Sequence, residues 1–287
     1  MKAKKHTIEP YLWLAPTIIL FAVFTFYPFL KTAYMSLFIV NSMGETKRFV
    51  GLGNYLYIFQ DDKFVKSIIN TFVYVLISVP ASKVIGLLLA LLANRKRKTS
   101  SIYEVLFSLP MAMSMSVSAI IFQLLYNPSF GAINYIFHLN INWLNDERYA
   151  MLAIGIISIW MSSGYAFLFM LAAVRNVPED ILESTDLEGA SWWQKVRYIY
   201  LPLTSPTMFF LICTSLASSM MMTALVNVLT DGGPFHSTQT IIHYMYSQFA
   251  VAGNYTNAFP AAIVAFILAA AVTWLSFLYE KKGVHYQ

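Results

Sequence analysis

The sequence predicts an all-α, polytopic membrane protein with six transmembrane helices. The first observation behind this prediction is the composition: 58% of the 287 residues are hydrophobic and only 11% are charged, against about 25% charged residues in soluble domains. The second is the length of the apolar segments, because roughly 20 helical residues cross a bilayer core of about 30 Å. We place the spans, within one transmembrane domain of residues 1–287, near 11–37, 69–93, 103–126, 150–173, 203–229 and 258–279.

The first span follows a basic N-terminus and contains two prolines. Lys2, Lys4 and Lys5 precede it, as in a signal peptide, but the apolar run is too long and lacks a small-residue cleavage site. We therefore expect it to remain as a transmembrane helix. Pro16 and Pro28 predict irregularities within that helix.

Lysine and arginine residues are distributed unevenly between the two sides of the predicted bundle. Twelve fall on the side of the termini: Lys2, Lys4, Lys5, Arg95, Lys96, Arg97, Lys98, Arg175, Lys195, Arg197, Lys281 and Lys282. Five fall on the opposite side: Lys47, Arg48, Lys63, Lys66 and Arg148. Because cytoplasmic loops carry the excess of basic residues, we expect both termini to be cytoplasmic. This topology, rather than binding to nucleic acid, explains the net charge of +5.

The loop at residues 174–202, between the fourth and fifth spans, is the one polar interval that looks built to contact another protein. Asn176, with Glu179 three residues later, predicts a capping box at the start of a helix. Pro178 fits an early helical position, and Gly189 is expected to end the helix. Five carboxylates fall within it: Glu179, Asp180, Glu183, Asp186 and Glu188. One side of this helix is therefore expected to meet water or a basic partner.

A second short helix is predicted directly after Gly189. Ser191 and Gln194 repeat the capping box, and Pro202 limits the segment downstream. Two short helices joined at a glycine form an elbow, which the basic-residue distribution assigns to the cytoplasmic side.

Within this elbow the sequence resembles a known family. The run ESTDLEGA at residues 183–190, followed by Leu201 and Pro202, is similar to the EAA loop of binding-protein-dependent ABC importer permeases. The glutamate, the glycine and the later Leu-Pro of the family pattern match, whereas Ser184 and Thr185 stand where the family has two alanines. The resemblance implies a cytoplasmic EAA-type coupling helix. It assigns an ATPase-coupling role to six residues: Glu183, Asp186, Gly189, Ala190, Leu201 and Pro202.

Two loops on the opposite side resemble the carbohydrate uptake class of these permeases. Residues 49–55 read FVGLGNY after the first span, where that class has F-V-G-L-x-N-Y. Residues 230–234 read TDGGP and Thr238 follows, which is similar to the T-x-G-G-P motif with a later threonine in the same class. By chemistry alone the second motif is a rigid turn, because glycine supplies a positive φ and proline fixes the next φ.

One lysine lies deep inside a predicted span. Lys83 is about ten residues, or 15 Å, from the basic end of the second span, which is further than a lysine side chain comfortably snorkels. Charges inside a membrane face a cavity or a partner. Two readings stay open: an ammonium group satisfied by carbonyls or by a second subunit, and a cation that lines the path of the substrate.

Other polar residues in the spans supply hydroxyl, amide and aromatic groups. Sugars are bound by this mixture, through hydrogen bonds at their rims and ring stacking on their apolar faces. Small hydroxyl residues also serve as ordinary packing contacts between membrane helices. With Lys83, the candidates for the substrate path are Ser118, Tyr126, Trp160, Tyr165 and Asn227.

The resemblance implies a non-catalytic permease subunit of an ATP-driven importer in a bacterial or archaeal cytoplasmic membrane. The chain has no G-x-x-x-x-G-K-[ST] loop, so we expect it to bind no cofactor or metal itself, and ATP and Mg²⁺ to be used by a partner ATPase. The implied partners are a second, homologous permease, two cytoplasmic nucleotide-binding subunits, an extracytoplasmic solute-binding protein and membrane lipid. The implied solute is a sugar or a related compound, with glycerol 3-phosphate or a polyol as alternatives.

Two other function classes act without an ATPase. A membrane-embedded enzyme is disfavoured because the chain lacks H-E-x-x-H and G-x-S-x-G motifs and any His or Asp pair deep in a span. A secondary transporter predicts buried ionisable residues for ion coupling and repeated halves, and Lys83 alone matches this poorly.

Overall fold

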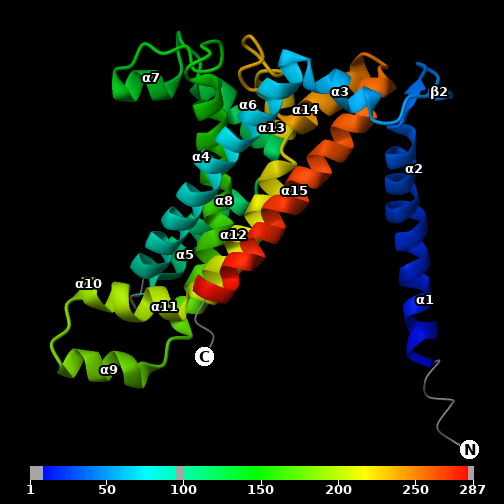
Figure 1. The fold of residues 1–287 in the computed structure, drawn as a ribbon. Coiled ribbons are helices and arrows are strands. Elements are labelled where there is room, and N and C mark those ends of the chain that lie inside the picture. The colour runs from blue at the N-terminus through cyan, green and yellow to red at the C-terminus, as the bar shows by residue number, and fades with distance from the viewer. Residues whose placement is uncertain (1–8, 95–99, 284–287) are drawn as a thin grey trace, which may run out of the picture. The chain divides into compact units, whose positions relative to one another are not determined.

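The structure is a computed structural model that describes residues 9–94 and 100–283 (Figure 1). The chain divides into two compact units, Met1–Phe64 with Tyr244–Val264, and Val65–His243 with Ala265–Gln287. The basic residues at 2–5 and 95–98, and the side chains of Lys281 and Lys282, lie outside what the structure describes.

The first unit begins with a long apolar helix that contains a π-helical turn. Its parts are α1 (Glu9–Phe21), η1 (Ala22–Phe26, π) and α2 (Tyr27–Met35). The π turn lies directly before Pro28, whose missing N–H removes an i→i−4 hydrogen bond, so the irregularity predicted at this proline is confirmed. The stretch Tyr11–Met35 is long and apolar enough to cross a membrane, and none of its most apolar window is buried against the described chain.

A small β-hairpin follows α2, and the sequence analysis did not predict it. Strands β1 (Phe38–Val40) and β2 (Thr46–Phe49) pair antiparallel. The turn between them is held by Asn41, whose Oδ1 accepts hydrogen bonds from the backbone N–H groups of Met43 and Glu45 at 3.2 and 2.8 Å. This is an Asx-type turn, in which a side chain replaces a backbone acceptor.

The FVGLGNY motif joins the hairpin to α3 (Gly53–Phe59) within the first unit. The side-chain amide of Asn54 is buried and donates hydrogen bonds to the carbonyls of Ser36 and Phe38, at 2.9 and 2.8 Å. Thr256 Oγ1 in turn accepts from the Val40 N–H at 2.9 Å. The asparagine of the motif therefore has a structural role, satisfying backbone carbonyls where α2 meets the hairpin.

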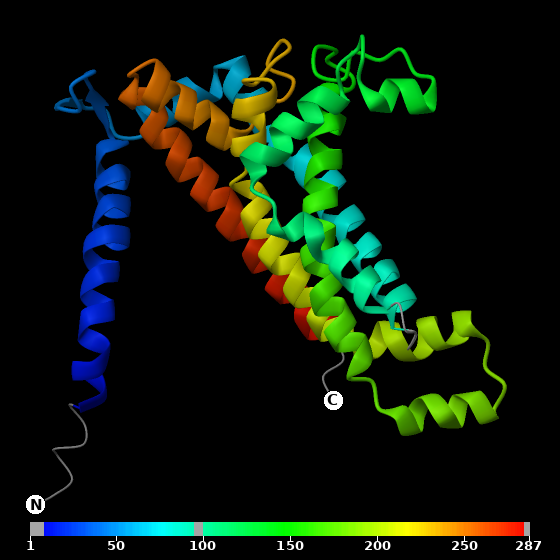
Figure 2. The same ribbon diagram turned by 180° about the vertical axis from the view of Figure 1, so that it is seen from behind.

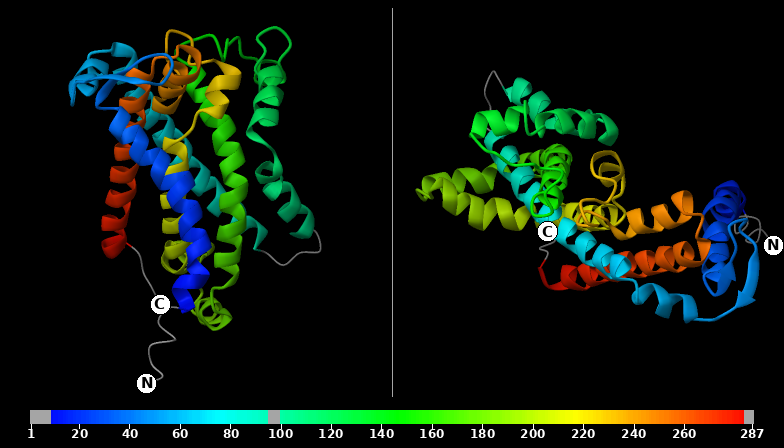
Figure 3. Two further views of the ribbon diagram at one scale, coloured as in Figure 1. Left: turned by 90° about the vertical axis from the view of Figure 1, so that its right-hand side faces the viewer. Right: turned by 90° about the horizontal axis from the view of Figure 1, so that it is seen from above.

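The second unit is a bundle of helices around α8. Figures 1 and 3 show α4 and the bent α5–α6 segment running along it. Its helices are α4 (Asp62–Ala93), α5 (Ser100–Ser108), η2 (Leu109–Ala112, 3₁₀), α6 (Met115–Leu125), α7 (Ala132–Phe137), α8 (Ala150–Arg175), α12 (Ser205–Met220), α13 (Ala224–Leu229), α14 (Ile241–Tyr246) and α15 (Tyr255–Gly283). Of these, α4, α14 and α15 each continue across the boundary between the units.

Small residues allow the backbones of α4 and α8 to approach closely. A Cβ added at Gly86 would lie 2.5 Å from the Cβ of Ala166, and one added at Gly155 would lie 2.8 Å from Ile77 Cγ2. Small residues at interfaces are the main packing device between membrane helices, because close approach increases van der Waals contact. At Gly86 and Gly155 the backbones of α4 and α8 therefore lie in close contact.

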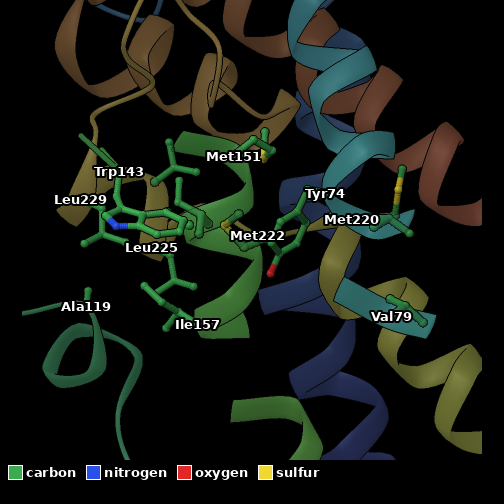
Figure 4. Packing of buried hydrophobic residues seen from close by; sticks show 14 of the residues in the cluster. Tyr74, Val79, Ala119, Trp143, Met151, Ile157, Met220, Met222, Leu225 and Leu229 are labelled. Carbon is green, nitrogen blue, oxygen red and sulfur yellow. The ribbon is translucent and has the colours of Figure 1, made fainter. Parts of the chain in front are cut away.

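The core of the second unit is a cluster of buried apolar side chains, shown in Figure 4. Trp143 packs in this cluster, and its indole N–H donates to Asn134 Oδ1 at 2.8 Å, which satisfies its one polar group. The ring of Tyr126 lies 5.3 Å from that of Trp143. Other members are Tyr74, Val79, Ala119, Met151, Ile157, Met220, Met222, Leu225 and Leu229.

Two of the expected spans are broken rather than straight. In the described residues four helices are long and apolar enough to cross a membrane, or up to six if each of two bent pairs counts as one span. The segment predicted near 103–126 bends by 101° between Ala112 and Met115, after a 3₁₀ turn that contains Pro110. The segment predicted near 203–229 begins at a 65° bend at Thr204 and is interrupted again at residues 221–223. Counting each bent pair as one span is compatible with the predicted six, and the exact bounds of the spans stay predictions.

Gly86→Ala is expected to destabilise the protein, because its new methyl group would clash with Ala166 unless the two helices separate. Overpacking of this kind costs about 1–3 kcal/mol. The measurement is thermal unfolding of the purified protein in detergent. Val84→Ile adds one carbon at an exposed position of the same helix and is the matched control. Equal melting temperatures for both variants would contradict the close α4–α8 contact.

Candidate coupling elbow and solute cavity

The polar interval after α8 forms two short helical arms. They are α9 (Glu179–Leu187) and a second arm made of α10 (Trp192–Lys195), η3 (Val196–Tyr200, π) and α11 (Leu201–Leu203). We call residues 176–203 the elbow. Figure 2 shows both arms at one end of the second unit, beyond the ends of α5 and α8, with α7 at the other end.

The first arm starts differently from the expected capping box. Asn176 is the C-cap of α8, with its N–H bonded to the carbonyls of Ala172 and Ala173, and its helical φ/ψ prevents it from also capping α9. Pro178 is the N-cap instead, without a side-chain hydrogen bond. The predicted Asn176 box was therefore wrong. Glu179 and Asp180 in the first turn stabilise the helix through their charge at the positive end of its dipole.

The junction between the arms follows the prediction. Gly189 has φ +75°, a left-handed conformation that glycine adopts without strain, and it lies directly after the last residues of α9. The Ala190 N–H bonds to the Thr185 carbonyl at 3.0 Å, which satisfies an unpaired carbonyl at the helix end. Gly189 therefore sets the direction in which the second arm leaves the first.

The second arm begins with the predicted capping box. Gln194 Oε1 accepts from the Ser191 N–H at 2.7 Å, and Ser191 Oγ accepts from the Gln194 N–H at 3.4 Å. Pro202 lies in the last helical turn before the bend at Thr204. The arm thus begins at Ser191 and ends one residue after Pro202.

Two ion pairs join helices within the elbow and next to it. Lys195 on the second arm bonds to Asp186 on the first, which joins the arms across Gly189. Arg175, the last residue of α8, pairs with Glu104 on α5 at 2.5 Å. Exposed pairs of this kind contribute about 0–1 kcal/mol each, so they select a geometry more than they add stability.

The six predicted coupling residues lie on α9, at the junction between the arms and at the end of the second arm, and their coupling role stays a prediction. Glu183, Asp186, Gly189 and Leu201 are exposed, and Ala190 and Pro202 are partly buried. Large apolar side chains stand beside them in water-accessible positions: Leu187 is 90% exposed and Trp193 is 64% exposed. Exposed apolar groups next to an acidic helix face are typical of a protein–protein interface.

A cavity of about 330 Å³ lies inside the second unit, between four helical segments and the 3₁₀ turn η2. It is lined by Lys83, Pro110, Met111, Met115, Met161, Ser162, Tyr165, Thr214, Ser215 and Ser218. A second cavity of about 190 Å³ shares Met115, Met161, Ser162 and Ser218 with it, and reaches Tyr74, Ser158 and the break between α12 and α13. The two cavities therefore adjoin each other.

Lys83 is the only charged residue in the lining of the larger cavity. Its side chain is 2% exposed, and its Nζ has no hydrogen-bond partner in the described part of the chain. Burying an unpaired ammonium group costs on the order of several kcal/mol. Such a group is retained where a ligand or another subunit supplies its partner.

The structure brings together only part of the predicted substrate path. Lys83 and Tyr165 line the larger cavity. Ser118 is fully buried on α6, and the Tyr126 hydroxyl donates to the Ala153 carbonyl at 3.0 Å within the core. Trp160 packs on the Phe122 ring, and Asn227 accepts from the Thr223 hydroxyl at 3.1 Å. None of these last four lines either cavity, and their contact with a solute stays a prediction.

The sequence analysis did not single out Thr214 and Ser215 on α12, which line the same wall as Ser218. The available signal was the spacing of Thr214 and Ser218, because residues four apart lie on one face of a helix. Among the described residues, no group of three or more His, Cys, Asp or Glu side chains is placed to hold a metal ion.

The TDGGP turn is closed by its two threonines. Thr238 Oγ1 lies 2.7 Å from Thr230 Oγ1 and donates to the Gly233 carbonyl at 2.7 Å. Gly232 has φ +81°, as predicted for this turn. Asn70 on α4 donates to the carbonyls of His236 and Gln239 at 2.8 and 3.1 Å. The motif is therefore a loop fixed to α4 by side-chain hydrogen bonds.

Comparison with known proteins identifies the family. The model of the family described as "binding-protein-dependent transport system inner membrane component" matches residues 82–281, which include the elbow and both cavities except Tyr74. The chain belongs to this family. A "probable ABC transporter permease protein" of Pyrococcus horikoshii is 34% identical to it, and the alignment covers 95% of each chain. The "sn-glycerol-3-phosphate transport system permease protein UgpA" of Agrobacterium fabrum is 29% identical, over 98% of this permease and 97% of the relative.

Solved structures show that the fold is that of ABC transporter permeases. A chain of a bacterial ABC transporter involved in import of the acidic polysaccharide alginate superposes with a TM-score of 0.84, covering 97% of this permease and 96% of that chain at 22% identity. A chain of the MetNI methionine ABC transporter superposes with a TM-score of 0.62 at 12% identity, covering 81% and 99%. The fold prediction is therefore confirmed.

Ser191→Ala is expected to loosen the second arm of the elbow. Loss of the N-cap hydroxyl typically costs about 1 kcal/mol of helix stability, so amide hydrogen exchange should rise over residues 191–200. Ser184→Ala is the matched control, because the Ser184 hydroxyl only bonds back to the Ile181 carbonyl within α9. Unchanged exchange in Ser191→Ala would contradict the capping role of Ser191.

Proposed function

We propose that this permease is a subunit of an ATP-driven importer and forms, with a second permease, the path for a sugar or a related hydroxylated solute. The observation that carries the substrate class is the larger cavity. Its wall combines the hydroxyl groups of Ser162, Thr214, Ser215 and Ser218, the Tyr165 ring and one ammonium group. Polyhydroxylated solutes need this mixture of hydrogen-bonding groups and an aromatic face.

The relatives support the same substrate class. The permease resembles a transport protein named for sn-glycerol 3-phosphate and, in fold, a chain of an importer of an acidic polysaccharide. The latter transporter has also been solved with an alginate pentasaccharide-bound periplasmic protein. Delivery of the solute by an extracytoplasmic binding protein is part of the proposed function.

Energy enters at the elbow in this proposal. Two separate nucleotide-binding subunits bind ATP and Mg²⁺, and one of them docks on the elbow through Glu183, Gly189 and the exposed apolar groups beside them. Their closure displaces the two arms as one body, because Asp186 and Lys195 join the arms and Arg175 ties α8 to α5. The displacement moves α8 and α12, which line the cavity, and α5, which leads into the lining turn η2, and so changes access to the cavity from one side of the membrane to the other.

Reconstitution tests the proposal. The permease is purified with its partner permease and ATPase, placed in proteoliposomes with ATP inside, and supplied with the cognate binding protein outside. Import that requires both ATP and the binding protein is expected. Import by the permease without the ATPase would favour a secondary transporter, and chemical conversion of the solute would favour a membrane enzyme.

Glu183→Lys and Gly189→Pro are expected to abolish association with the ATPase while leaving membrane insertion intact. The first reverses a charge on the elbow surface, and the second cannot adopt φ +75°, since proline is held near −65°. Co-purification of the ATPase with a tagged permease is the measurement. Glu45→Lys, a charge reversal on the exposed hairpin, is the control. Normal transport in both elbow variants would remove the coupling assignment.

The elbow and both chain termini are expected to lie in the cytoplasm. In a Cys213→Ser background, a cysteine at Leu187 should resist a membrane-impermeant maleimide added to intact cells, and a cysteine at Tyr135 on α7 should react. Both positions are highly exposed in the permease alone, at 90% and 82%, so in cells that express it without its ATPase, reactivity reports the side of the membrane rather than burial. Both should react after cell lysis, and labelling of Leu187→Cys in intact cells would refute the orientation.

A further inference from the structure

The ammonium group of Lys83 is a feature of the larger cavity to which the proposed function assigns no specific partner. It lines the cavity, is almost completely buried, and has no hydrogen-bond partner within the described residues. Among the described residues, the lining contains no aspartate, glutamate or histidine. The permease therefore supplies no anion in this lining to pair with the three N–H donors of the ammonium group.

Two hydroxyl groups that α12 contributes to the cavity lining are biased toward accepting hydrogen bonds. The Thr214 hydroxyl donates to the Phe210 carbonyl at 2.9 Å, and the Ser218 hydroxyl donates to the Thr214 carbonyl at 2.8 Å. Each hydroxyl proton is thus engaged in the backbone of α12, which leaves the oxygen as an acceptor. A bound molecule that carries hydroxyl groups can donate hydrogen bonds to these two oxygens.

We propose that the solute is a hydroxylated anion whose oxyanion group pairs with Lys83 while its hydroxyl groups donate to Thr214 and Ser218. This rests on the proposed function and narrows it from sugars in general to compounds such as a polyol phosphate or a sugar carboxylate. The pairing is strong because a charge-assisted hydrogen bond gains strength where the charged group is shielded from water, as the Lys83 side chain is at 2% exposure. A neutral sugar leaves the ammonium group unpaired and is rejected at that cost.

The methionines of the lining increase the difference in binding between an anionic and a neutral solute. Met111, Met115 and Met161 form the apolar part of the wall and offer an ammonium group no acceptor beyond the weak thioether sulfur. The solute itself is then the source of the missing negative charge. The competing source is an acidic side chain of the second permease, and the experiment separates the two.

The test measures import by the complete transporter in proteoliposomes with its binding protein. The probes are two matched pairs, sn-glycerol 3-phosphate with glycerol, and galacturonate with galactose, so that a phosphate and a carboxylate are each compared with a neutral counterpart. Three variants are compared with the natural sequence: Lys83→Met, Lys83→Arg and Lys31→Met. Lys31 is an exposed lysine on α2 and serves as the control for loss of one positive charge.

The expected result is import of one anionic probe and exclusion of its neutral counterpart. Lys83→Met should lower that import by about tenfold or more, as expected for loss of a hydrogen bond to a charged group. Lys83→Arg should retain a large part of the import, and Lys31→Met all of it. Whether the phosphate or the carboxylate is imported identifies the anion.

Several results would overturn the assignment. Import of a neutral probe alone, or of none of the four probes, is one such result. Unchanged import of the anionic probe by Lys83→Met is another. Loss of the second permease from purified Lys83→Met would show that Lys83 pairs with that subunit. Binding-protein-dependent import of a neutral probe would leave the proposed function standing. If the transporter imports nothing in an ATP-dependent manner, the proposed function fails as well.

Discussion

Backbone hydrogen bonding inside a membrane constrains this structure more than any other factor. A helix can break in hydrocarbon only where its unpaired N–H and C=O groups are buried in protein or line a cavity. Three breaks in the second unit obey this rule. Met111 and Met115 flank one break and line the larger cavity, Met221 to Thr223 form another and line the smaller cavity, and Thr204, at the third, is buried. The irregular backbone and the cavities are therefore parts of one arrangement.

The same bundle connects the cavity wall to the elbow. Helix α8 carries Ser162 and Tyr165 at the cavity and ends at Arg175, directly before the elbow. The close approach of Gly86 to Ala166 keeps α4, with Lys83, in register with α8. A force applied at the elbow reaches the cavity through packed helices, which have low compressibility. This geometry suits the transmission of motion between a docking surface and a solute path.

Local interactions were predictable from the sequence, and tertiary ones were not. The Ser191–Gln194 box and the end of α9 at Gly189 depend on residues within one helical turn, so the pattern alone sufficed. Asn176 was misread because the pattern does not reveal that α8 continues to it, and one residue cannot hold the conformations of a C-cap and an N-cap together. Pro110 and Pro202 lie next to the bends, yet the bend angles depend on what the helices pack against.

The candidate cavity was predicted only in part for a related reason. Depth along an apolar segment is a one-dimensional property, and it identified Lys83. Whether a side chain lies in the core or at a cavity depends on the neighbouring helices. The sequence analysis therefore did not distinguish Tyr126, which lies in the core, from Thr214, which lines the cavity. The short hairpin was missed because its stability comes from Asn41 and Asn54 bonding to backbone groups, not from an alternating apolar pattern.

The thioether side chains around the cavities have a consequence for selectivity. Methionine is unbranched and has three rotatable bonds, so it changes rotamer at little energetic cost. A pocket with such walls adjusts its contour to guests of different size without rearranging the bundle. In the proposed function, size is then a weak criterion for passage, and discrimination falls on the few directional groups, Lys83, Thr214 and Ser218, whose positions are set by the helices that carry them.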